Sequence, residues 1–210
     1  MNTEHKLTPE TYHRRYGLPV KSMRQAIEKE LIAGSDAFDA HAKMTQVANG
    51  MALRRDPQTG GAIEAVGYLR RLLDLLQEEI VYRYGLSDED YRPLSDDGYL
   101  PKLVNLRNLR DADEVKVEEE SNLTHREFFD LYGGGSSNIG RMLNKAIRAE
   151  TFDGNAILDS LGATTLMAKK YRERGIDELA DLASNAGRII KGIADSLAKQ
   201  IMRIYNLEER

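Results

Sequence analysis

Residues 63–85 read IEAVGYLRRLLDLLQEEIVYRYG, and this stretch decides the fold class. Its large apolar side chains return every three or four residues, which is the period of one face of an α-helix, whereas a half-buried strand alternates every second residue. The spacing predicts a helix that begins just after Pro57 and the Gly60-Gly61 pair and stops at Gly85. The expected buried stripe comprises Ile63, Val66, Leu69, Leu73, Leu76 and Ile80.

The same period occurs on both sides of this stretch. Residues 36–55 predict a weaker helix, and the turn at 57–61 would fold it into an antiparallel hairpin with the first. A longer helix is expected over 176–205, with an apolar seam that either packs within the chain or joins two copies as a homo-oligomer. No segment has the pattern of a sheet, so we expect an all-α protein. The seam consists of Leu182, Ala186, Ile189, Ile193, Leu197, Ile201 and Ile204.

Composition limits the classes of protein. The 210 residues are 41% hydrophobic and 30% charged, which suits a globular chain with a proper core. Cysteine is absent, which excludes disulfides and thiolate metal sites. We expect a cytoplasmic protein, in a bacterial host or in a virion if it is phage-encoded, because no apolar run resembles a signal peptide or a membrane span. The histidines are too scattered for a metal site: His5, His13, His41 and His125.

The acidic residues are concentrated in one segment. Residues 86–120 contain eleven acidic and five basic side chains, a local charge of −6, although the whole chain carries only −4. Pro93, Gly98 and Pro101 indicate an irregular connector. We therefore predict an amino-terminal helical lobe over 1–85, an acidic linker over 86–121 and a carboxyl-terminal helical lobe over 122–210. The linker is either a solvated loop or an arm that mimics a nucleic acid strand or binds a partner.

Part of the amino-terminal segment recurs after the linker. LTPETYHRRYGLPVKSMRQAIEKEL begins at Leu7, and LTHREFFDLYGGGSSNIGRMLNKAI begins at Leu123, a constant offset of 116 residues. Each copy predicts a helix that a threonine caps and Tyr-Gly ends, followed by a turn and an amphipathic helix. The recurrence reflects either a duplication or convergence on one helical hairpin. The apolar or aromatic residues that match at this offset are Tyr12 with Phe128, Met23 with Ile139 and Ile27 with Leu143.

Each copy also has the residue types of a DNA-reading helix. Short polar side chains at a helix start suit the edges of bases, and cations one or two turns later suit phosphates, although the same residues serve as ordinary caps and solubilising groups. In the first copy the candidates are Lys21, Ser22, Arg24, Gln25 and Lys29. In the second copy they are Ser137, Asn138, Arg141 and Lys145.

Residues 155–175, NAILDSLGATTLMAKKYRERG, give the most detailed functional signal. They predict a helix-turn-helix in which Gly162 makes the turn, a threonine caps the second helix and cations meet phosphate. A helix-hairpin-helix that grips phosphate at Gly162 would share these features. The candidates for contact with DNA are Thr164, Thr165, Lys169, Lys170 and Arg172.

Three resemblances point the same way. LGATTLMAKKY resembles the centre of helix-turn-helix regulators, and LTPETYHRRYGLP resembles the carboxyl-terminal stretch of Ros/MucR-type bacterial regulators, without the zinc ligands that precede it in those proteins. The predicted architecture is similar to that of phage small terminase subunits. These resemblances imply binding to double-stranded DNA, in transcriptional regulation or in DNA packaging.

Motifs for catalysis are missing. The sequence has no phosphate-binding loop, no His-Glu-x-x-His and no nucleophile elbow, and the linker acids do not have the spacing of a calcium loop. We therefore expect no enzyme activity, no cofactor and no metal. The alternative to DNA binding is a helical phage, virion or assembly protein that binds other proteins.

Overall fold

The computed structural model describes residues 7–17, 19–87, 94, 100–104, 124–134 and 138–207, with the backbone alone for 19–21. These residues form helices and their connections, with no strand among them, which confirms the predicted all-α class. The elements are α1 (Pro9–Tyr16), α2 (Pro19–Glu30), α3 (Gly34–Leu53), α4 (Thr59–Tyr84), α5 (His125–Phe128), the π-helical turn η2 (Phe129–Gly133), α6 (Ile139–Glu150), α7 (Gly154–Glu173) and α8 (Asp177–Ile204).

The three long helices that the apolar period predicts are present close to the expected limits. α3 starts two residues before the predicted 36–55 helix, α4 covers the opening stretch, and α8 covers the predicted 176–205 helix. Gly85 follows α4 with a φ of 59°, the left-handed conformation that glycine adopts without a steric penalty. Local signals therefore define these helices correctly.

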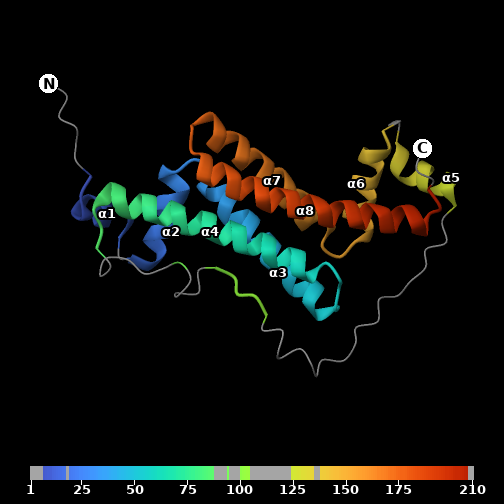
Figure 1. Cartoon of the computed structure of the whole chain (residues 1–210), viewed down its shortest axis with the longest axis horizontal. Coiled ribbons are helices and arrows are strands. Elements are labelled where there is room, and N and C mark those ends of the chain that lie inside the picture. Colours follow the sequence, from blue (N-terminus) through green and yellow to red (C-terminus); the bar gives the residue numbers. More distant parts are fainter. Residues whose placement is uncertain are drawn as a thin grey trace.

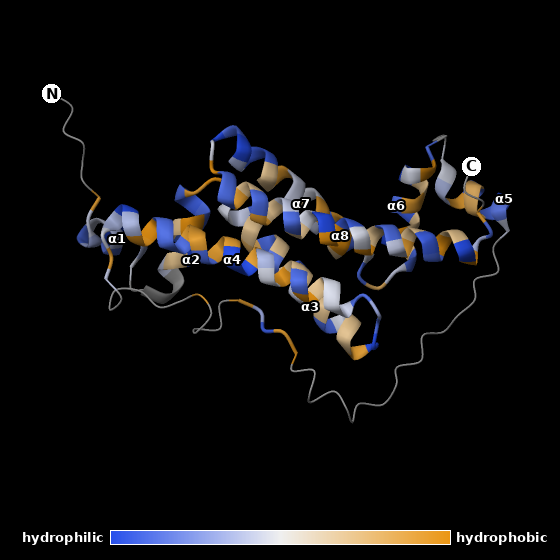
Figure 2. Ribbon diagram, viewed as in Figure 1, coloured by the Kyte–Doolittle hydropathy of each residue, from blue (hydrophilic) through white to orange (hydrophobic). Residues whose placement is uncertain are grey.

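Four helices form the centre of the molecule. α3–α4 and α7–α8 are hairpins, and α3 packs on α7 while α4 packs on α8 (Figure 1). The α3–α7 pair is antiparallel, because Asp36 near the start of α3 forms an ion pair of 2.9 Å with Lys170 near the end of α7, and Arg54 just after α3 forms one of 2.8 Å with Asp153 just before α7. Hydrophobic and hydrophilic residues alternate in bands along these helices, as amphipathic packing requires (Figure 2).

This arrangement corrects the prediction of two separate lobes. The helices of 1–85 and of 122–210 contribute to one shared core, since α4 packs on α8 and α3 on α7. α8 buries most of its seam inside the chain: Ile193 and Ile201 are almost fully covered, whereas Ile204 is 55% exposed. Most of the seam is therefore occupied without a second copy, and its packing gives no support to a homo-oligomer formed through the carboxyl-terminal helix.

The second half of the fold repeats the first. Gly34 opens α3 and Gly154 opens α7, 120 residues later, and both helices are 20 residues long. Buried positions of α8 follow those of α4 by 121 residues (183 − 62 = 121). The corresponding pairs are Ala62 with Ala183, Ala65 with Ala186, Val66 with Gly187, Leu69 with Ile190, Leu72 with Ile193, Leu73 with Ala194, Leu76 with Leu197 and Ile80 with Ile201.

Each half ends in the same cluster of aromatic rings around a glutamate. In the first half, the hydroxyls of Tyr16 and Tyr84 both donate to the Glu30 carboxylate, and the ring of Tyr12 lies 5.3 Å from each of theirs. Burial, with the nearby carboxylate, raises the pKa of Tyr16 above its ordinary value, so the tyrosine stays a donor. The equivalent residues of the second half are Phe128, Tyr132, Glu150 and Tyr205.

The repeat extends over all the described helices, which favours a duplication over convergence on a single helical hairpin. Its register differs in part from the sequence prediction: the offset of 116 holds from Tyr16 to Tyr132, but Ile27 corresponds to Ile147 and not to Leu143. A Cβ built on Gly34 would lie 2.3 Å from the carbonyl oxygen of Ile27, and one built on Gly154 would lie 2.0 Å from that of Ile147. Four extra residues thus fall between η2 and α6. A four-residue shift is about one helical turn, so it leaves the apolar face unchanged and escapes a sequence comparison.

His41 of α3 is a buried titratable group inside this core. Its side chain is 2% exposed, and its Nδ1 has no hydrogen-bond partner in the described part of the chain. Burial, together with the positive charge of Arg70, lowers the pKa of His41 to about 4. The repeat places Leu161 at the equivalent position of α7, so the site accepts an apolar side chain in the other half.

We predict that His41 makes the protein less stable in acid. The unfolded chain protonates this histidine below about pH 6.5, while the folded chain resists protonation until about pH 4, so the free energy of unfolding should fall by about 3 kcal/mol across that range. Urea unfolding between pH 7 and pH 4 measures this loss. His41→Leu should remove that part of the pH dependence; an unchanged profile in the variant would contradict the assignment.

Candidate protein-binding groove between α7 and α8

The predicted helix-turn-helix at 155–175 is absent, because α7 is one continuous helix from Gly154 to Glu173. Gly162 lies inside this helix, on its exposed side, and a Cβ there would meet nothing within 4 Å. The threonine hydroxyls do not cap a new helix: Thr164 donates to Ser160 O at 2.9 Å, and Thr165 donates to Leu161 O at 2.8 Å. An interior glycine disfavours helix by about 1 kcal/mol, which the burial of α7 outweighs.

The candidate side chains of α7 separate into two groups. Thr164 is fully buried, and its Oγ1 would lie 3.0 Å from a Cβ built on Gly187 of α8, so it belongs to the contact between the helices. Lys170 is held by Asp36 of α3. The exposed members are Thr165, Lys169 and Arg172, all on one side of α7.

The first repeated segment forms two helices, as predicted, but uses its candidate residues internally. Ser22 is buried and its hydroxyl hydrogen-bonds that of Tyr12 at 2.9 Å. Arg24 forms an ion pair of 2.7 Å with Glu28 and stacks over the ring of Phe38. Gln25 and Lys29 are exposed, with Lys29 over the ring of Tyr16, and the side chain of Lys21 lies outside the described residues.

The second segment behaves similarly. Asn138 caps α6, where its side chain accepts from the backbone N–H groups of Gly140 and Arg141. Lys145 Nζ donates to Tyr132 O at 3.3 Å. Arg141 is exposed, and Ser137 lies outside the described residues. Three polar candidates are therefore not available to contact bases, because they are buried or form local hydrogen bonds: Ser22, Asn138 and Thr164.

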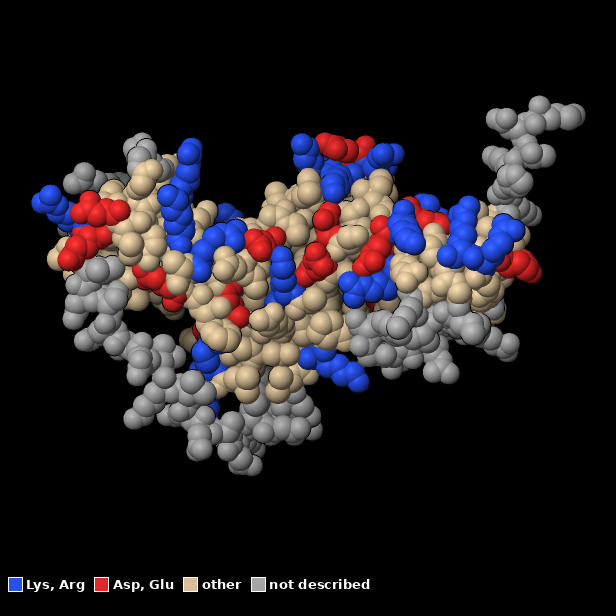
Figure 3. Space-filling model, turned by 180° about the vertical axis from the view of Figure 1, so that it is seen from behind, with Lys and Arg blue, Asp and Glu red and all other residues tan. Residues whose placement is uncertain are grey.

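The candidate cations do not share one surface. α6 lies beside the start of α7, where Arg148 Nη1 donates to Asn155 Oδ1 at 3.0 Å. Lys169 lies 14 residues further along α7, or about 21 Å at 1.5 Å per residue. Seen from behind, Lys and Arg alternate with Asp and Glu instead of forming one basic face (Figure 3). A duplex footprint needs a continuous basic surface, and this arrangement does not supply one on that face.

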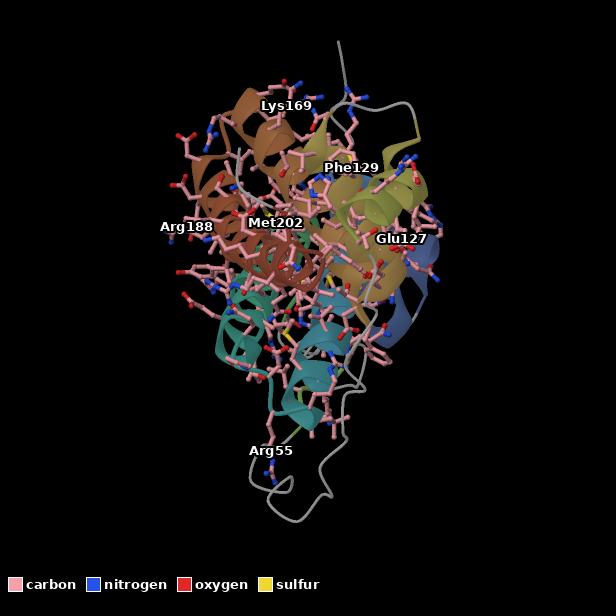
Figure 4. The ribbon with its side chains drawn as sticks, turned by 90° about the vertical axis from the view of Figure 1, so that its right-hand side faces the viewer. Arg55, Glu127, Phe129, Lys169, Arg188 and Met202 are labelled. Atoms are coloured by element: carbon pink, nitrogen blue, oxygen red, sulfur yellow. The ribbon has the colours of Figure 1, made fainter. Side chains whose placement is uncertain are left out.

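A groove between α7 and α8 brings together the exposed candidates and residues that the sequence analysis missed. It has a volume of about 780 Å³ and a mainly apolar lining. Lys169 projects outward from α7 and Arg188 from α8 (Figure 4). The apolar side includes Leu161, Ala168, Ala183 and Gly187. Four cations line the same groove, namely Lys169, Arg172, Arg188 and Lys191.

The acids near the groove leave part of this positive charge free. Lys169 lies 3.8 Å from Glu173, which also lines the groove, Arg172 lies 3.9 Å from Asp181, and Lys191 lies 3.0 Å from Asp195. All three pairs are largely exposed to solvent, and such surface pairs contribute little and exchange readily with other anions. In the sequence, Ser184, Arg188 and Lys191 have the spacing of one face of a helix, beside the small residues of the seam. This spacing does not show that they face the groove, because that depends on how α8 aligns with α7.

Other classes of site find no support in the described part of the chain. No group of three or more histidine, aspartate or glutamate side chains comes together there as metal ligands. None of its helices is both long and apolar enough to cross a membrane. Comparisons with family models, curated proteins and solved structures give no match.

Two glycine substitutions test the continuous α7. Gly162→Ala should stabilise the protein by about 0.5–1 kcal/mol, because alanine favours a helix interior and the position is open. Gly154→Ala is the matched contrast and should destabilise by about 1–3 kcal/mol, since its Cβ would lie 2.0 Å from Ile147 O. Denaturant unfolding of both variants measures this. If Gly162→Ala destabilised the protein instead, this result would contradict the continuous helix and support the predicted turn at Gly162.

Proposed function

We propose that this chain is a non-catalytic helical assembly protein that binds another protein through the groove between α7 and α8. The observation that carries the proposal is the placement of Thr165, Lys169 and Arg172 beside an apolar groove. Protein ligands gain affinity from buried apolar surface at the centre of a site and orientation from charges at its rim. The groove has both parts.

The competing proposal, a DNA-reading protein, draws its main support from the four groove cations. Sequence readout needs polar side chains that project from a helix into the major groove. Ser22, Asn138 and Thr164 form internal contacts instead, and Lys170 is engaged by Asp36. A mainly apolar surface also contributes little to the binding of a phosphate backbone, which depends on positive charge. These observations favour a protein ligand, and the setting in a bacterial host or a virion stays a prediction.

A binding assay with DNA decides between the two proposals. We predict that labelled mixed-sequence duplexes bind the intact chain weakly at low salt, and that Lys169→Glu with Arg172→Glu changes this binding no more than the control Lys199→Glu, an exposed α8 residue outside the groove. Fluorescence anisotropy at 25–200 mM salt measures the affinity. Tight binding that falls steeply with salt and is lost only in the groove variant would establish DNA binding and refute the assembly role.

A further inference from the structure

We infer that the groove between α7 and α8 accepts an extended, acidic segment of a partner polypeptide, as the equivalent face of α3–α4 accepts a segment of this chain. This ligand rests on the proposed protein-binding function and adds that the bound segment is extended and negatively charged. It follows from the duplication, because one of the two equivalent faces already shows what covers it.

The face of α3–α4 is covered by residues that follow α4. Leu94 and Leu100 are 2% and 5% exposed and belong to the hydrophobic core. Leu94 N donates to Gln77 Oε1 of α4 at 3.2 Å. Residues 100–104 then run along the side of α3 and α4 that faces away from α7 (Figure 1). Among the described residues of this segment, Leu94 and Leu100 thus turn inward, whereas Leu103 is exposed and Val104 is half-buried.

Asn49 of α3 fixes the position of this segment. Its Nδ2 donates to Lys102 O at 3.0 Å, and its Oδ1 accepts from Val104 N at 2.7 Å. The amide thus binds two backbone groups of an extended chain, as a neighbouring strand would. The duplication places Lys169, a residue of the α7–α8 groove, at the position of Asn49 (169 − 120 = 49).

The other helices that cover the two hairpins match one another. α2 packs on α3 and α4, and α6 packs in the same way on α7 and α8. Among the described residues, the extended segment has no such counterpart on α7–α8. Burial agrees with this difference: Thr45 of α3 is 0% exposed, whereas Thr165, its equivalent in α7, is exposed. The groove is thus an equivalent binding face without its covering segment.

The groove has a different chemistry from the covered face. Three of its four cations, Lys169, Arg172 and Arg188, replace the uncharged Asn49, Ala52 and Gly67 of the first half, while Lys191 replaces Arg70. A lysine donates hydrogen bonds but cannot accept one from a backbone N–H. Carboxylates on the incoming segment would satisfy these cations, so the duplication changed the preference toward an acidic ligand.

The residues at the base of the groove are smaller than their equivalents on the covered face. Thr164 replaces Met44, and Gly187 replaces Val66. Smaller side chains leave room for apolar side chains of the ligand, while Ala168 and Ala183 repeat Ala48 and Ala62. The expected segment therefore combines apolar residues, which enter the groove, with acidic residues, which reach its rim.

A peptide from this chain supplies the probe. The peptide LSDDGYLPELV has the sequence of residues 94–104 with Lys102→Glu, and its uncharged match LSNNGYLPQLV has the same apolar residues. We expect the intact chain to bind the acidic peptide at least tenfold more tightly than the uncharged one, in fluorescence anisotropy. Lys169→Glu with Arg188→Glu should weaken the acidic peptide at least tenfold, whereas Lys199→Glu should leave it unchanged.

A label in the groove reports where the peptide binds. The chain has no cysteine, so Ser184→Cys places one environment-sensitive dye in the groove, and Gln200→Cys places one on the exposed side of α8 outside it. The acidic peptide should shift the emission of the first dye only. Unchanged melting temperatures of all variants establish that the fold is intact.

The outcomes separate the two proposals. Equal affinity for both peptides, no binding, or a shift of both dyes would overturn the acidic-segment inference while leaving an assembly role through another ligand. If the chain does not bind the peptide but has the mass of a dimer in solution, and the groove variant is a monomer, then the groove binds a second copy of this chain and not a partner polypeptide. Salt-dependent capture of duplexes by the same cations would overturn both proposals.

Discussion

The antiparallel packing of α3 on α7 and of α4 on α8 is the constraint on which the rest of the structure depends. Each hairpin has apolar residues on the side that faces the other hairpin, and neither could cover that side alone. The duplicated half supplies the missing surface. The chain thus resembles a dimer joined into one polypeptide, which explains why most of the seam of α8 is already buried without a second copy.

Periodicity and turn residues predict most of this fold. The apolar period and Gly85 define most of α4 and its end, because these signals act within a few residues, whereas the Gly60-Gly61 pair lies inside the helix instead of before it. The shared core is not predictable in this way, since it depends on contacts more than a hundred residues apart. The register of the repeat was wrong by four residues in α2 and α6, because one helical turn restores the same apolar face.

The functional site shows the same limit. Gly162 and Thr164 have the residue types of a turn and a cap, but Thr164 packs against Gly187 and continues the helix. Thr165, Lys169 and Arg172 are exposed, and their role in contact with DNA stays a prediction; their neighbours on α8 are not predictable from the sequence, because they depend on how the two helices align. Among the described residues, one hairpin face is covered and its equivalent is not, and the second face carries three more cations than the first.

Hydrogen exchange during urea titration tests the shared core most directly. Mass spectrometry of peptides from α4 and α8 gives the opening free energy of each helix in one sample, without any substitution. The account predicts that both helices have the same free energy of opening and lose protection at the same urea concentration, since each completes the core of the other. Loss of protection in one helix at a urea concentration that leaves the other native would contradict it and indicate two independent lobes.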